Sequence, residues 1–172
     1  MKLNVNDLPM KIKELKSGDL IYLSGTVYTA RDAAHKRICE LIEKSEALPF
    51  PLKNSAIYYA GPTETKEGHV IGSCGPTTSA RMDKFTPTLY DLGLICTIGK
   101  GERNEEVVDS IKKNSAIYLC AIGGAGALAA KCITEAKVIA FHDLGCESVK
   151  ELKFKDFPLV VGIDSFGNSI FK

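Results

Sequence analysis

The feature that most constrains the fold is the alternation of apolar strand-like runs with helical runs in the second half of the chain. Strands are predicted at 94–101, 115–124 and 137–145, each a short apolar run. Helices are predicted between them at 104–114 and 126–136. This order favours parallel strands in one sheet, with the connecting helices packed against it. The expected fold class is therefore α/β.

The first half of the chain adds further strands and one long helix. Residues 20–29 are rich in β-branched and aromatic residues and predict a strand, and 30–46 predicts a helix with apolar residues at 3.6-residue spacing. Further strands are expected at 55–62 and 69–76, joined by a loop that contains glycine. A last strand is expected at 159–164. The sheet is thus expected to be only partly parallel.

Length and composition fit one globular domain over residues 1–172. Hydrophobic residues make up 45% of the chain and charged residues 25%, and no linker-like segment divides it. The net charge of +1 gives no general electrostatic reason to bind nucleic acid or a membrane surface. No apolar run approaches the ~20 residues of a membrane span. The N-terminal stretch lacks an apolar signal core, so a cytoplasmic location is expected.

The cysteines show no metal-binding pattern. No two of them form a CxxC pair, and their spacing matches no common ligand set. We therefore predict no metal site in this chain and interpret the thiols as reduced and mostly structural. The role of Cys74, next to the polar motif described below, stays open. The six cysteines are Cys39, Cys74, Cys96, Cys120, Cys132 and Cys146.

A glycine-rich turn offers one functional alternative, a nucleotide-binding module. The spacing Gly124-x-Gly126-x-x-Ala129 follows a predicted strand and opens a predicted helix, and Asp143 follows at the distance of a ribose-binding acid. Fewer than 30 residues follow Asp143, too few for the rest of a doubly wound half. We favour the interpretation that the glycines allow a close approach to the sheet or to a partner.

The segment GPTTSARMD, residues 75–83, is unusually polar for a stretch between two apolar runs. It follows a predicted strand end, where α/β folds place ligands. Thr77 offers a hydroxyl, and the Arg81 guanidinium can grip a carboxylate through two parallel hydrogen bonds. The alternative is a helix cap followed by a surface salt bridge between Arg81 and Asp83.

Two other predicted strand ends also present a cation. Arg31 follows the strand at 20–29, and Lys100 lies between two glycines at the end of the strand at 94–101. Parallel strands bring their carboxyl ends to one edge of a sheet, so Arg31, Arg81 and Lys100 are expected to form one anion site. Three cations in a chain of near-zero net charge match a small dicarboxylate.

The motifs GTVYTARDAAHKRI, YYAGPTETKEGHVIGSCGPTTSARMD and IGKG strongly resemble the β subunit of two-subunit class I fumarases and L-tartrate dehydratases. In single-chain class I fumarases, the stretch equivalent to this chain forms the C-terminal domain. The resemblance covers nearly the whole chain. It implies a hydro-lyase that interconverts a 2-hydroxy dicarboxylate and its dehydrated product, with (S)-malate and fumarate as the leading pair and tartrate as the other possibility.

The resemblance also implies a cofactor, a partner and a fold. In such enzymes an oxygen-sensitive 4Fe-4S cluster has one iron that acts as Lewis acid, and its cysteine ligands belong to an α subunit that is a separate chain here. The implied assembly is an α2β2 heterotetramer that is active only with both subunits. The implied fold is a three-layer swivelling β/β/α domain.

Four residues of this chain match the functional positions of the family. The resemblance makes Arg31, Arg81 and Lys100 substrate-binding residues and Thr77 the proposed catalytic base. An aliphatic hydroxyl is a weak base unless nearby cations stabilise its alkoxide. Whether Thr77 is the base or only positions substrate is therefore left open.

Overall fold

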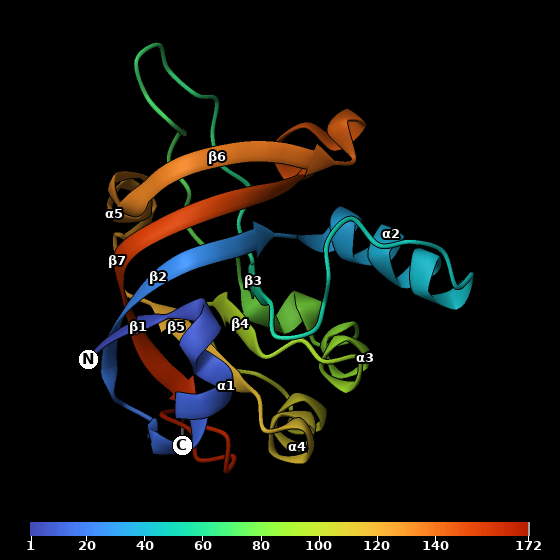
Figure 1. Cartoon of the computed structure of the whole chain (residues 1–172), viewed down its shortest axis with the longest axis vertical. Coiled ribbons are helices and arrows are strands. Elements are labelled where there is room, and N and C mark those ends of the chain that lie inside the picture. The colour runs from blue at the N-terminus through green and yellow to red at the C-terminus, as the bar shows by residue number, and fades with distance from the viewer. Residues whose placement is uncertain (172) are drawn as a thin grey trace.

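The structure, a computed structural model, describes residues 1–171 and contains one mixed seven-stranded sheet. The strand order is β1-β2-β3-β4-β5-β7-β6 (Figure 1). The pairs from β1 to β5 are parallel, whereas β7 is antiparallel to β2, β5 and β6. This confirms an α/β fold with a partly parallel sheet. The strands are β1 (Lys2–Asn4), β2 (Leu20–Thr29), β3 (Ala56–Tyr58), β4 (Cys96–Gly99), β5 (Ile117–Ala121), β6 (Ile133–Ala140) and β7 (Val149–Ile163).

The sheet closes on itself, because β2 pairs with β7 as well as with β3. The long strand β7 contacts β6 through its first half and β5 through its second half, and β2 runs along its other edge. The strands β2, β3, β4, β5 and β7 therefore form a hydrogen-bonded ring, in which few backbone groups remain at a free edge.

Three helices lie together on one side of the sheet, and a fourth packs beside its antiparallel strands. The helices α2, α3 and α4 gather on the same side, whereas α5 lies beside β6 and β7 (Figure 1). The helices are α1 (Leu8–Lys11), α2 (Asp32–Glu43), α3 (Thr86–Asp91), α4 (Glu105–Asn114) and α5 (Ala125–Cys132). Short 3₁₀ helices span Val5–Asp7, Ile12–Glu14, Ser79–Met82 and His142–Glu147. None of the helices in residues 1–171 has the length and apolarity to cross a membrane.

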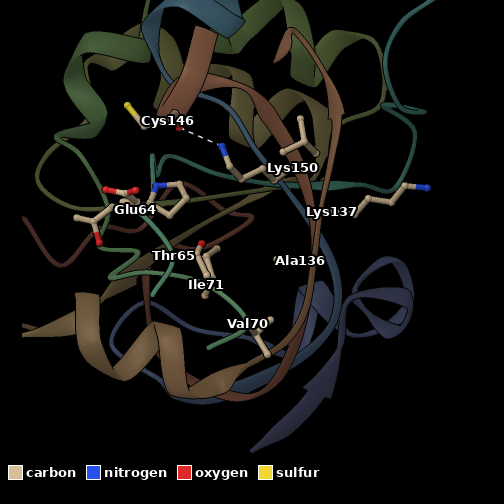
Figure 2. A pocket seen from close by; sticks show the side chains of 11 residues that line it. Glu64, Thr65, Val70, Ile71, Ala136, Lys137, Cys146 and Lys150 are labelled. Carbon is tan, nitrogen blue, oxygen red and sulfur yellow. Dashed lines mark hydrogen bonds between the residues drawn. The ribbon is translucent and has the colours of Figure 1, made fainter. Parts of the chain in front are cut away.

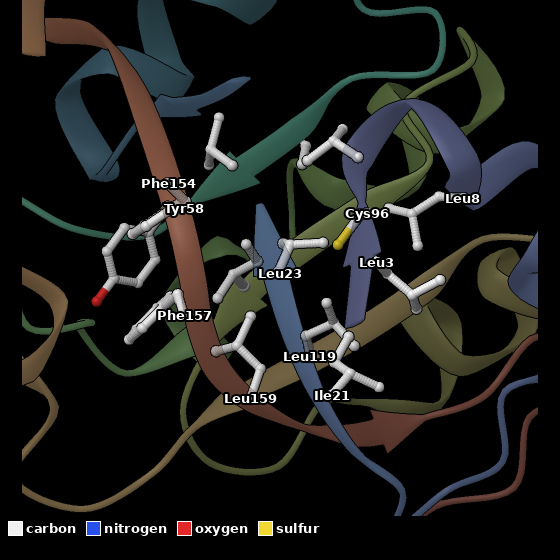
Figure 3. Close-up of a cluster of buried hydrophobic side chains, with 14 of the residues drawn as sticks. Leu3, Leu8, Ile21, Leu23, Tyr58, Cys96, Leu119, Phe154, Phe157 and Leu159 are labelled. Carbon is white, nitrogen blue, oxygen red and sulfur yellow. The ribbon is translucent and has the colours of Figure 1, made fainter. Parts of the chain in front are cut away.

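The core lies between the strands of this ring. Figure 3 shows Leu23, Tyr58 and Leu159 close together, with the stacked rings of Phe154 and Phe157 beside them at a centroid distance of 4.7 Å. Full burial of one such side chain stabilises the fold by about 1.5–3 kcal/mol. A second buried cluster fills the space between the sheet and the helices α2, α3 and α4.

Three predictions of local structure are wrong. Residues 69–76 form no strand: 70–72 are bends and Pro76 makes only an isolated bridge with Ala60, while Gly72 packs closely on the Thr63 backbone. The helix predicted at 126–136 ends at Cys132, and β6 begins at the β-branched Ile133 and ends at Ala140. The final strand, predicted at 159–164, starts ten residues earlier, at Val149.

Candidate anion-binding site at the strand ends

The predicted site residues lie at the carboxyl ends of parallel strands. Arg31 follows β2, and Lys100 follows β4 directly. The segment 75–83 crosses the end of β3, where the Thr77 backbone N–H donates to the Tyr59 carbonyl at 2.7 Å. The topology thus brings three segments that are distant in sequence to one edge of the sheet, as expected for an α/β ligand site.

Thr77 and Arg81 are in direct contact. The 3₁₀ helix Ser79–Met82 turns the chain so that Arg81 Nη2 donates to Thr77 Oγ1 at 3.0 Å. Because the threonine oxygen accepts this bond, its own proton is free to be donated elsewhere. The adjacent cation also stabilises negative charge on that oxygen.

Arg81 pairs with Asp32, a residue that the sequence reasoning did not include in the site. Arg81 Nε and Nη2 donate to the two carboxylate oxygens of Asp32 at 3.2 Å and 2.9 Å. Burial raises the pKa of Asp32, but the hydrogen bond from Arg81 and the charges of Arg81 and Arg31 outweigh it and lower the pKa overall. Both side chains are about half exposed, so the pair itself adds little stability.

The alternative pair between Arg81 and Asp83 is wrong. Asp83 is buried and accepts a hydrogen bond from Arg103 Nε at 2.6 Å instead. The sequence contained a signal for the true partner, since a carboxylate at position 32 directly follows Arg31 at a strand end. Sequence spacing favoured Asp83 only because it is closer along the chain.

Arg31 caps the start of α2 and lies against Gly61. A Cβ at Gly61 would lie 3.0 Å from both Cδ and Nη1 of Arg31, so a larger residue there would push the guanidinium away. Arg31 Nε is buried and has no hydrogen-bond partner among the described residues. An unpaired buried donor is costly.

His35 supports the Arg31 backbone from within the core. Its Nδ1 lies 2.8 Å from the Arg31 carbonyl, which can only accept, so Nδ1 carries the proton. Burial lowers the pKa of His35 to about 4. The side chain is therefore neutral at physiological pH and has a structural role in this arrangement.

The backbone of Lys100 is hydrogen-bonded to the segment 75–83. Its N–H donates to Ser79 Oγ and its carbonyl accepts from the Ser79 N–H, both at 3.0 Å. Its exposed side chain borders a pocket of about 580 Å³ that is also lined by Pro76 and Gly124. No hydrogen bond within residues 1–171 joins the Lys100 side chain to Arg31, Thr77 or Arg81.

The glycine-rich turn does not have a dinucleotide-binding topology. The strand β6 that follows α5 pairs antiparallel with β7, whereas the dinucleotide fold needs a parallel neighbour. Asp143 lies in the 3₁₀ helix after β6 and pairs with Arg37 at 2.6 Å. Gly126 instead packs against Ser73 and Gly75, where a side chain would overlap Ser73 Oγ. The glycine is needed for this close approach.

A separate pocket of about 390 Å³ lies between the 62–71 loop and β6 (Figure 2). Lys150 lines this pocket, and its side chain donates to the Cys146 carbonyl at 3.2 Å and to Ser148 Oγ at 2.8 Å. Burial lowers the pKa of Lys150 and raises the pKa of Cys74 to about 12. The Cys74 thiol therefore stays protonated, which favours a structural role.

No group of three or more His, Cys, Asp or Glu residues that could hold a metal ion occurs within residues 1–171. Cys74, Cys96 and Cys120 are buried, and burial raises the pKa of each thiol. Within residues 1–171 the cysteines therefore offer no grouped ligand set for an iron–sulfur cluster.

The structure defines an α/β protein that places Arg31, Arg81 and Lys100 at the carboxyl ends of its parallel strands. The family described as Fumarase C-terminus matches residues 1–172. The putative L(+)-tartrate dehydratase subunit beta of Methanocaldococcus jannaschii is 42% identical over 179 residues, which cover 100% of this chain and 92% of that protein. The chain belongs to the fumarase C-terminus family, and the resemblance is confirmed.

Other relatives are much longer than this chain. Fumarate hydratase 2 of Leishmania major is 38% identical over 173 residues, which cover 99% of this chain but 30% of that protein. The aerobic class I fumarate hydratase of Escherichia coli K12 is 38% identical over 152 residues, covering 87% of this chain and 28% of the enzyme. The chain thus spans less than a third of the length of these relatives.

Proposed function

We propose that this chain is the β subunit of a hydro-lyase and supplies half of an active site for a 2-hydroxy dicarboxylate. The observation that supports this most is the contact of Arg81 with Thr77 at the carboxyl ends of the strands, where Arg31 and Lys100 also lie. A relative of matching length is named as a subunit beta of a tartrate dehydratase, and longer ones as fumarate hydratases. Malate and fumarate are the substrates that we favour, with tartrate as the other possibility.

The three cations would bind the two carboxylates of the substrate. Arg81 would donate to one carboxylate through the nitrogen that its partners leave free, and Arg31 and Lys100 supply further positive charge. Since Asp32 already engages Nε and Nη2 of Arg81, the remaining Nη1 is the guanidinium nitrogen open to substrate. Asp32 thus orients Arg81 without covering it completely.

Thr77 is our candidate for proton transfer. Dehydration breaks a C–H bond, whose proton goes to a base while its electron pair forms the C=C bond. It also breaks the C–O bond of the neighbouring carbon, whose hydroxide leaves and takes up a proton to become water. If Thr77 gives up its hydroxyl proton, which balances the one taken up by the leaving hydroxide, the alkoxide stabilised by Arg81 Nη2, 3.0 Å away, could accept the C–H proton. In the other version of the proposal, Thr77 only orients the substrate.

The cofactor and partner follow from the family. Because the cysteines of this chain do not fit cluster ligation, we propose that the 4Fe-4S cluster is bound by an α subunit, which supplies the Lewis acid. We further propose an α2β2 assembly in the cytoplasm that is active only with both subunits. The three-layer swivelling arrangement implied by the resemblance belongs to the same proposal.

The test is reconstitution of the pair. This chain is expressed anaerobically with an α-type subunit that carries three well-separated cysteines, and the pair is assayed on malate, fumarate and tartrate. We expect reversible hydration of one of these dicarboxylates by the pair and none by either subunit alone. A correctly assembled, cluster-loaded pair without activity on all three would contradict the proposal.

A further inference from the structure

A buried arginine outside the predicted site joins several elements beneath it. The Arg103 side chain is fully buried, and its Nε donates to Asp83 Oδ1 at 2.6 Å. Its two terminal nitrogens donate to three hydroxyls, those of Thr97 at 3.1 Å, Tyr59 at 3.1 Å and Thr86 at 2.8 Å. All three guanidinium nitrogens are therefore engaged, which a lysine with its single nitrogen could not reproduce.

Asp83 and Arg103 also connect the two backbone segments that carry predicted site residues, 77–83 and 99–104. The second oxygen of Asp83 accepts from the Asn104 N–H at 2.8 Å, which links the segment 79–83 to the residues after Lys100. The guanidinium of Arg103 lies over the ring of Tyr118, 4.8 Å from its centroid. Arg103 thus contacts both segments. It binds the Asp83 carboxylate of one segment directly, and it packs over Tyr118, the aromatic residue that contacts the other segment.

Tyr118 completes the link through a continuous chain of hydrogen bonds. Its hydroxyl lies 2.8 Å from the Gly101 carbonyl and 2.8 Å from Ser79 Oγ. Because a carbonyl can only accept, Tyr118 donates to Gly101 and accepts from Ser79, which itself accepts from the Lys100 N–H. Each proton in this chain has one acceptor, so the arrangement is fully satisfied.

We propose that Arg103 is a positioning residue that locks the segment 77–83, with Thr77 and Arg81, to the segment 99–104, with Lys100. The inference rests on the proposed function, because a fixed separation of the cations matters only if one ligand bridges them. A displacement of about 1 Å at a reacting group can lower a rate about 10²-fold. Loss of the lock should therefore lower kcat more than it raises KM.

The main variant removes both buried charges together. Breaking a buried pair on one side leaves an unpaired buried charge, whereas replacing both partners avoids that penalty. We therefore choose Arg103→Met with Asp83→Asn, and Arg103→Lys as the conservative variant. The matched control is Arg37→Met with Asp143→Asn, which removes an exposed arginine–aspartate pair between α2 and the 142–147 segment.

Three measurements on the full chain and on the reconstituted pair test the proposal. They are the urea midpoint, amide hydrogen exchange at Thr77, Ser79, Lys100 and Asn104, and kcat and KM. In the double variant at Arg103 we expect a chain that still folds with a somewhat lower midpoint, exchange at least ~10-fold faster at these amides than in the control pair, and kcat lower by about 10²-fold. We expect a smaller loss of kcat for Arg103→Lys and none for the control pair.

The result that overturns the proposal is a folded double variant with wild-type exchange and kcat. If that variant does not fold, Tyr118→Phe replaces it, since it removes only the links to Ser79 and Gly101. Unchanged exchange at Lys100 and unchanged kcat in Tyr118→Phe would also count against the lock. If the wild-type pair has no hydro-lyase activity, the proposed function fails, while the exchange measurement still decides whether Arg103 joins the two segments.

Discussion

At the scale of single residues, the guanidinium of Arg81 is oriented before any ligand binds. Asp32 accepts from two of its nitrogens and Thr77 from one of them. Such preorganisation reduces the entropy that binding must overcome. The functional roles of Arg31, Thr77, Arg81 and Lys100 remain predictions, and variants of each can test them.

Replacing Arg81 with lysine should weaken catalysis while it keeps the charge. Lysine has a single nitrogen and cannot hold Asp32, Thr77 and substrate in the same geometry, and one charge-assisted hydrogen bond is worth about 1.5–3 kcal/mol, so kcat/KM should fall about 10- to 150-fold. Steady-state kinetics of the reconstituted pair measures this loss. Arg37→Lys, at another bidentate pair, is the control and should leave kcat/KM close to wild type.

Replacing Thr77 with alanine separates the two roles of its hydroxyl. If Thr77 is the base, kcat should fall about 10²–10⁴-fold with little change in KM. If it only positions the substrate, both constants should change modestly. Thr78→Ala is the control, because Thr78 is exposed and lies next to Thr77. Equal effects of the two variants would rule out a special role for Thr77.

The buried His35 should make stability depend on pH. Its pKa is about 4 in the folded chain, against 6.5 for an unperturbed histidine, so the unfolded chain binds the proton first as the pH falls. The free energy of unfolding should therefore decrease between about pH 6.5 and 4, by on the order of 3 kcal/mol. His35→Gln should flatten this part of the urea-stability profile, whereas the exposed His69→Gln should keep the wild-type slope. A wild-type slope in His35→Gln would contradict the assignment.

At the scale of elements, the end of β4 is shaped by its contact with the 3₁₀ helix that carries Arg81. A Cβ on Gly99 would overlap Ser79 Oγ and lie 2.8 Å from Tyr59 Cδ2. The absence of a side chain at Gly99 is therefore what lets the segment 77–83 lie directly over the strand end.

Gly99→Ala should displace that segment. Overpacking of a tight site costs about 1–3 kcal/mol, and here the strain falls on Ser79 and hence on Lys100. We expect a lower urea midpoint and a lower kcat/KM in the pair. Gly123→Ala is the control, because a Cβ there meets no atom within 4 Å. Wild-type kinetics in Gly99→Ala would show that the close approach is not needed for function.

At the scale of the whole molecule, the chain offers cations at a sheet edge but no fitting metal ligands among its described residues. We predict that the isolated chain takes up no stoichiometric iron during anaerobic reconstitution with iron and sulfide. Iron analysis and visible absorbance measure this directly. Four irons per chain would contradict the assignment of the cluster to the α subunit.

The sequence by itself determined the fold class, the family and the order of most elements in the second half. The strands β4 and β5 and the helix α4 lie close to their predicted places. Their patterns are local, since apolar periodicity and flanking turn residues depend on neighbours within a few positions. The motifs around Arg31, Thr77, Arg81 and Lys100 are local in the same sense.

Only the tertiary structure decided which distant groups meet. Arg81 pairs with Asp32, 49 positions away, instead of the nearby Asp83. Asp83 forms its ion pair with Arg103 instead, and no local sequence pattern had indicated that Arg103 is buried. The strand β7 likewise closes the sheet by pairing with β2, β5 and β6. Such choices depend on which surfaces the packed core brings together, and the free energy of burying a charge or a strand edge is set by that packing rather than by sequence spacing.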